Sequence, residues 1–129
     1  MAPLKTATGT DEIGDVVVAV VMVDSDERSK IERDLKQYGF NVRCFSDEKG
    51  YANAARQIQF GAVLAQGATS TEVGRALKLA AQPGKYCLVN SNRAIIDMLS
   101  LQSLIGYCLE PEYSREDLVK TVEQMLRES

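Results

Sequence analysis

The chain has 129 residues, of which 45% are hydrophobic and 26% are charged, and its net charge is -3 with a pI near 5.0. This length fits one domain with a core on both sides of a sheet. The basic residues are scattered along the sequence, which disfavours direct binding to nucleic acid. The chain contains no histidine, which excludes imidazole ligands, imidazole bases and phosphohistidine.

The longest apolar run covers residues 16–23 and is far shorter than the roughly 20 residues that span a bilayer. The N-terminus lacks the charged and apolar regions of a signal peptide, so we expect a cytoplasmic protein that does not enter the membrane. Its three cysteines have no CxxC spacing and are odd in number. We therefore interpret them as small hydrophobic residues of the core, not as a disulfide framework or a zinc site.

Residues 1–15 are small and polar without apolar periodicity, so we expect a flexible N-terminal leader before a folded domain at 16–129. The β-branched run at 16–23, VVVAVVMV, is typical of a central strand that is covered on both faces. A helix is predicted over 24–39, with Ser25 or Asp26 as the N-cap and Gly39 as the stop.

Apolar and amphipathic segments then alternate to the end of the chain. The further predicted strands are residues 41–45, 60–65, 86–89 and 105–109. The further predicted helices are residues 47–59, about 71–82, 91–104 and a last helix that opens with a Ser114–Asp117 capping box. Five strand and helix units in alternation predict a parallel α/β sheet.

Ligands of an open parallel sheet bind at the carboxyl ends of the strands, so the residues that follow each strand are the candidate site. These residues are Asp24, Ser25, Gln66, Asn90 and Glu110.

The spacing of these residues resembles that of a response-regulator receiver domain, over residues 16 to about 127. The segments VMVDSDERSK, FGAVLAQG, YCLVNSN and IGYCLEPEYSREDL carry the resemblance. It implies a flavodoxin-like (βα)5 fold, a doubly wound parallel sheet with strand order 2-1-3-4-5. It also implies a role in two-component signalling or a phosphorelay.

The residues at the site depart from the pattern of that family. Its acidic pair falls on Asp24 and Ser25, and its phospho-accepting aspartate falls on Gln66. Its hydroxyl residue falls on Asn90, and its Lys-Pro step falls on Glu110 and Pro111. The aromatic switch position falls on Tyr107, which fits.

Each departure weakens phosphotransfer. The Gln66 amide has no oxygen of a carboxylate's nucleophilicity, and Ser25 removes an anionic ligand that Mg²⁺ prefers. Glu110 places an anion where a cation would stabilise phosphoryl oxygens. We therefore predict a pseudo-receiver that is not an enzyme, has no metal or cofactor, and is independent of phosphorylation.

Several interpretations stay open. Glu110 is expected to accept hydrogen bonds from Gln66 and Asn90, whereas a remade metal site of Asp24, Asp26, Glu27 and Glu110 is the alternative. Tyr107 is either a static half-buried aromatic or a rotameric switch. The apolar surplus of the helix predicted at 91–104 is either core or part of an interface. That interface would bind a protein partner or a second copy through Ile96, Leu99 and Tyr107, on the face formed by the fourth helix, fifth strand and fifth helix.

Two other functions remain as alternatives. The scaffold could bind a nucleotide, a flavin or another small ligand at the strand ends, although no GxGxxG or GxxxxGK[ST] loop is present. The domain could also accept phosphate unconventionally on Asp24 or Ser25. The sequence does not separate a stand-alone adaptor from a module of a longer regulator.

Overall fold

A computed structural model describes residues 16–80, 85–91, 94, 97 and 106–127. The leader expected at 1–15 lies outside these residues. Most of the helix predicted at 91–104 also lies outside them, including Ile96 and Leu99.

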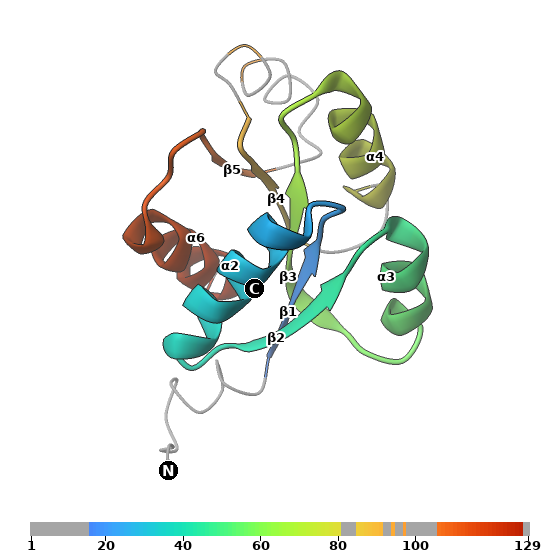
Figure 1. Ribbon diagram of the computed structural model, residues 1–129. Helices are drawn as coiled ribbons and strands as arrows, with labels where there is room; N and C mark the ends of the chain where they lie inside the picture. The colour runs from blue at the N-terminus through green and yellow to red at the C-terminus, as the bar shows by residue number, and fades with distance from the viewer. Residues whose placement is uncertain (1–15, 81–84, 92–93, 95–96, 98–105, 128–129) are drawn as a thin grey trace.

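The described residues form a five-stranded parallel sheet in the order β2-β1-β3-β4-β5 (Figure 1). This confirms the predicted doubly wound sheet with order 2-1-3-4-5. The strands are β1 (Val17–Val21), β2 (Asn41–Phe45), β3 (Phe60–Gln66), β4 (Tyr86–Val89) and β5 (Tyr107–Leu109).

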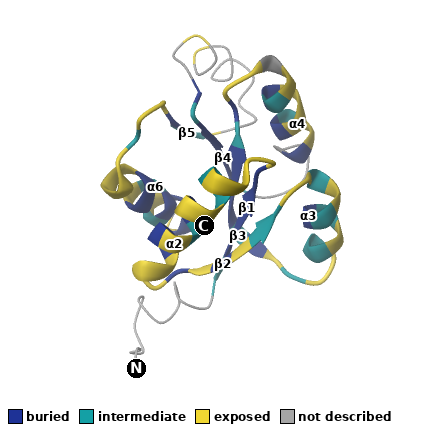
Figure 2. Ribbon diagram, viewed as in Figure 1, coloured by how far each residue is buried: buried dark blue, intermediate teal, exposed yellow. Residues whose placement is uncertain are grey.

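Helices cover both faces of the sheet. The described helices are α2 (Ser25–Gln37), α3 (Glu48–Ala55), α4 (Ser70–Ala80) and α6 (Arg115–Arg127). Core residues of α2 and α6 share one apolar cluster, and those of α3 and α4 share the other. Figure 2 shows that each helix buries its side toward the sheet and exposes the other side. No helix among the described residues has the length and apolar character needed to cross a membrane.

Strand β1 lies at the centre of both clusters, as its β-branched run predicts. Val18 and Val20 are fully buried on the α2 and α6 side, and Ala19 and Val21 are buried on the other. The strand ends at Val21, two residues before the predicted end, and the side chain of Val23 is 64% exposed. Burial on both faces is what a central parallel strand requires.

The helix ends follow from capping chemistry. Asp24 is the N-cap of α2, and its carboxylate accepts hydrogen bonds from the backbone N–H groups of Asp26 and Glu27. The predicted caps, Ser25 and Asp26, are therefore wrong, because both residues already lie within the helix. Gly39 has a positive φ of 92°, in agreement with its predicted role as the stop.

The start of α6 confirms the predicted capping box. The Ser114 hydroxyl accepts from the Asp117 backbone N–H at 3.0 Å, and the Asp117 carboxylate accepts from the Ser114 N–H at 3.3 Å. All three cysteines are free thiols, with Cys87 buried and Cys44 and Cys108 half-buried.

Candidate functional site

The parallel sheet brings the residues that end or follow its strands to one edge of the molecule. Gln66 is the last residue of β3, one position inside the strand rather than after it. The other residues follow their strands as predicted, namely Asp24 and Ser25 after β1, Asn90 after β4 and Glu110 after β5. We call this edge the strand-end rim.

On the β1 side of the rim, the acidic residue serves the helix. Asp24 Oδ1 lies 2.9 Å from the Asp26 nitrogen and 3.0 Å from the Glu27 nitrogen. Its neighbour Ser25 is exposed and supplies no anionic oxygen. In the described part of the chain, no group of three or more His, Cys, Asp or Glu side chains is placed to hold a metal ion. The donors here do not fit Mg²⁺, which prefers several anionic oxygens.

Gln66 has a neutral and incompletely satisfied side chain. Its Oε1 atom is buried and has no hydrogen-bond partner among the described residues. Beside it is a hollow of about 20 Å³ between the end of β1, the start of α3 and the side of α4, lined also by Ser46, Glu72 and Arg75. A space of that size holds about one water molecule. Gln66 therefore presents a carboxamide beside a space for about one water molecule.

A hydroxyl does lie at the rim, one residue beyond the expected position. Ser91 is fully buried, and its Oγ donates to the Gly67 carbonyl oxygen at 3.0 Å. The Gly67 N–H in turn donates to the Val89 carbonyl at 2.8 Å. Ser91 was not expected to bond at the rim, because the resemblance places the family's hydroxyl residue on Asn90. Its hydroxyl ties β3 to β4 instead of facing a ligand.

On the β4 and β5 side, three polar side chains meet. The Tyr113 hydroxyl donates to Glu27 Oε2, and the Asn90 amide lies 3.4 Å from the same oxygen. The ammonium of Lys30 lies 5.4 Å from the centre of the Tyr113 ring. Burial, followed by the hydrogen bond to Glu27, raises the pKa of the Tyr113 phenol well above its ordinary value, so the phenol remains a neutral donor.

The Asn90 amide donates to Glu27, which is half-buried in the first turn of α2 beside the end of β4. The Glu110 side chain is exposed and makes contacts of its own, and its expected hydrogen bonds from Gln66 and Asn90 stay a prediction. Sequence reasoning missed Tyr113 because its partner lies 86 positions away in the chain.

Tyr107 is the first residue of β5 as described, and it is half-buried against the α2 and α6 cluster. Next to it, β5, the loop after it and α6 enclose a groove of about 430 Å³. The groove is lined by the carboxylates of Glu110, Glu112 and Asp117 and by the ammonium of Lys120. These four side chains give the groove an excess of negative charge.

Comparison with known proteins agrees with this fold. No family model matches the chain, and no curated protein matches it. The receiver domain of the Francisella response regulator 1452 has a TM-score of 0.74 and 13% identity, over 88% of this chain and 98% of that one. A response regulator from Thermotoga maritima has a TM-score of 0.73 and 13% identity, over 87% and 98%.

A third solved structure has the same fold. The receiver domain of a sensor histidine kinase from Pseudomonas aeruginosa, with magnesium in its active-site cleft, has a TM-score of 0.70 and 16% identity, over 87% of this chain and 98% of that one. At such low identities the likeness establishes the fold alone. The fold of this chain is the fold of response-regulator receiver domains.

Proposed function

We propose that this chain is a phosphorylation-independent receiver-like domain that acts in the cytoplasm by protein–protein contact in a two-component-type system. The observation that carries the proposal is the carboxamide of Gln66 at the end of β3. Phosphoryl transfer to a receiver needs a carboxylate nucleophile, and an amide oxygen lacks the required basicity.

The surroundings of Gln66 support the same conclusion. Asp24 is engaged in capping α2, Ser25 is neutral, and Glu110 is anionic where the family pattern has a lysine. Each of these features removes electrostatic stabilisation from a phosphoryl group with its metal. The domain is accordingly proposed to have no catalytic activity.

The contact surface is proposed to include β5 and α6. Tyr107 lies on β5, and the 430 Å³ groove lies between β5 and α6. The proposed surface also includes Ile96 and Leu99, which lie outside the described residues. The occupant of this face would be a protein partner or a second copy of the chain.

Small-ligand binding has weaker support. The hollow beside Gln66 measures about 20 Å³, whereas ligand pockets usually measure about 300–1,000 Å³. The groove beside β5 is large enough, but three carboxylates line it. A nucleotide or flavin phosphate would meet repulsion at this groove.

The proposal is tested by NMR spectroscopy of the ¹⁵N-labelled chain with Mg²⁺ and beryllofluoride, which mimics a bound phosphoryl group. The expected result is that the amide resonances of Gln66, Asn90 and Tyr107 do not move. A matched comparison is the triple variant Ser25→Asp, Gln66→Asp and Glu110→Lys, in which the family pattern is restored at three positions and shifts are expected. Large shifts around Gln66 in the unmodified chain would overturn the proposal.

A further inference from the structure

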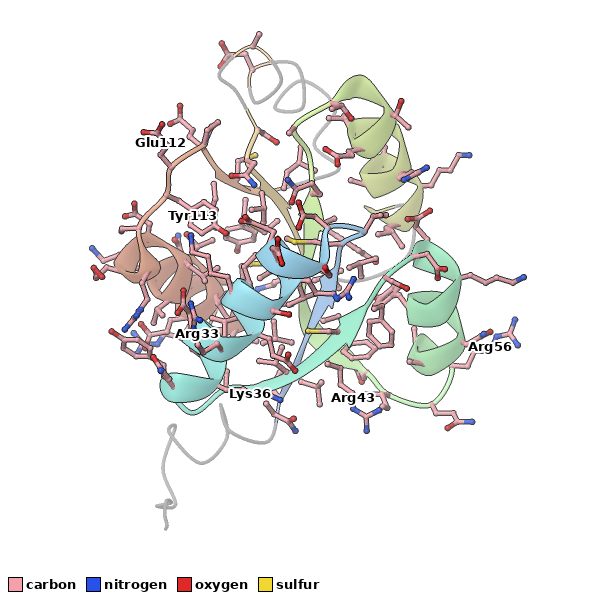
Figure 3. The ribbon with its side chains drawn as sticks, in the orientation of Figure 1. Arg33, Lys36, Arg43, Arg56, Glu112 and Tyr113 are labelled. Atoms are coloured by element: carbon pink, nitrogen blue, oxygen red, sulfur yellow. The ribbon has the colours of Figure 1, made fainter. Side chains whose placement is uncertain are left out.

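Three elements that are distant in the sequence meet at one carboxylate. Glu27 comes from the first turn of α2, Asn90 from the end of β4, and Tyr113 from the loop that leads into α6. In Figure 3, Tyr113 lies between that loop and the first turn of α2. We call these three residues the latch.

The chemistry of the latch favours a firm contact. The Glu27 carboxylate accepts from a phenol and an amide, and a hydrogen bond to a charged group is stronger than one between neutral groups. The Lys30 ammonium lies over the ring of Tyr113 and adds a favourable contact on its face. All three latch side chains are half-buried, so water competes less for their hydrogen bonds.

Unusual backbone geometry lies within or beside the latch. Among the described residues, the non-glycine residues with positive φ are Asn90 and Glu112, each with a φ of 66°. Asn90 belongs to the latch, and Glu112 immediately precedes Tyr113. Such conformations are sparsely populated and persist where the surrounding structure holds them. The backbone on both sides of the latch is therefore kept in place by tertiary contacts.

We propose that the Tyr113–Glu27 hydrogen bond is a conformational latch. It holds the loop at residues 110–114 against α2 and fixes the neighbouring groove in one state without a phosphoryl group. This inference rests on the proposed function, because it explains how a receiver-like domain keeps one state when its strand-end site accepts no phosphoryl group. The groove shares Tyr113 with the latch, so release of the loop changes the shape that a partner would meet.

The test compares Tyr113→Phe with Tyr38→Phe as the matched control. The first variant removes the latch hydroxyl but keeps the ring, whereas Tyr38 is 54% exposed at the end of α2. The measurement is the backbone ¹⁵N order parameter of residues 110–114 in the whole chain. In the unmodified chain and in Tyr38→Phe the expected value is about 0.85, and in Tyr113→Phe it is below about 0.6.

A second readout follows the connection between β4 and β5. The Ser91 N–H donates to the Leu109 carbonyl at 3.2 Å, so its hydrogen exchange reports on opening at this edge. In Tyr113→Phe we expect the exchange of this amide to be about tenfold faster, while exchange within β1 changes less than twofold. Glu27→Gln keeps an acceptor oxygen, so its effect should be smaller than that of Glu27→Ala.

Two results would overturn the latch. One is an unchanged order parameter for residues 110–114 in Tyr113→Phe. The other is faster exchange by one common factor throughout the sheet, which would make Tyr113 a purely structural residue. Failure of the proposed function is seen separately, as beryllofluoride-induced shifts in the unmodified chain. If Tyr113→Phe does not fold, the same measurements are made on Glu27→Gln and Glu27→Ala. A larger effect of Glu27→Ala supports the latch, and equal effects overturn it.

Discussion

The two sides of the strand-end rim differ in how their polar groups are used. On the β1 and β3 side, Gln66 is neutral with a buried unpartnered oxygen, and Asp24 caps a helix. On the β4 and β5 side, Glu27 accepts bonds from Asn90 and Tyr113. One side of the rim thus presents a carboxamide, whereas the other side joins two loops to α2 through Glu27.

The largest effect is expected from a substitution that disturbs the packing between the two sides of the rim. A Cβ atom added at Gly67 would lie 2.2 Å from Leu88 Cγ and 2.6 Å from Ser91 Oγ. We expect Gly67→Ala to lower the free energy of unfolding by about 2–3 kcal/mol, because the buried neighbours must shift. Denaturant titration measures this.

Gly74 provides the control for that substitution. It lies within α4, and a Cβ atom there would meet no atom within 4 Å. Gly74→Ala should therefore raise the free energy of unfolding by about 0.5–1 kcal/mol through helix propensity. Equal effects of the two substitutions would contradict the account of a tight joint at Gly67.

A smaller loss is expected where α2 meets α6. The Asp34 side chain is 4% exposed, and Arg115 Nε lies 3.4 Å from its Oδ1. Arg115→Ala should lower the free energy of unfolding by about 1–2 kcal/mol, because the buried carboxylate then has only the more exposed Arg33 guanidinium near it among the described residues, with Nε 3.8 Å from Oδ1. Asp34→Asn combined with Arg115→Ala should recover part of the loss. A double variant less stable than Arg115→Ala would contradict this.

Alkaline titration tests the surroundings of the Tyr113 phenol on the β4 and β5 side. Its pKa is raised in the folded chain by burial and by the bond to Glu27, so its contribution to stability is complete below the ordinary value near 10.0 and is lost as the pH rises above it. The folded chain and Tyr113→Phe should give the same phenolate absorbance at pH values near 10, where an ordinary tyrosine ionises.

The thiol of Cys44 tests the edge farthest from the latch. Burial, with the nearby Glu32 carboxylate, raises its pKa from 9.0 to about 11. At pH 8 the thiolate fraction is then about a hundredfold lower than for an ordinary thiol, and reaction with a disulfide reagent should slow to a similar degree. Rates for the folded chain and the unfolded chain at the same pH provide the comparison. Equal rates would contradict the expectation.

The smallest effect is expected on the outer surface of α2. Lys36 Nζ lies 2.9 Å from Glu32 Oε2, and both side chains are partly exposed. Glu32→Gln should lower the free energy of unfolding by no more than about 0.5 kcal/mol, because solvent screens such pairs. Thermal melts at low and high salt should show that the difference shrinks with salt. A loss comparable to that of Arg115→Ala would remove the distinction between surface and buried carboxylates.

The sequence predicted those features that depend on local pattern. The β-branched run of β1, the turn at Gly39 and the Ser114–Asp117 box each depend on residues close together in the chain. The position of Gln66 at a strand end followed from the same patterns. Prediction failed at the N-cap of α2, because three adjacent polar residues offered similar capping oxygens and only backbone geometry chooses between them.

The latch escaped prediction for a different reason. Tyr113 lies in a polar loop without periodicity, and its contact with Glu27 depends on the placement of α2 beside β4 and β5. The bond between Ser91 and Gly67 likewise depends on the pairing of two strands. Contacts of this kind arise from the assembled sheet and have no signal in the spacing of the residues.

The most direct test of the central claim is the intact mass of the chain after incubation with acetyl phosphate and Mg²⁺. The account predicts an unchanged mass, because Gln66 offers no carboxylate and the remaining donors do not fit the metal. A mass increased by one phosphoryl group, mapped by peptide analysis to Asp24, Ser25 or any other residue of the rim, would contradict it.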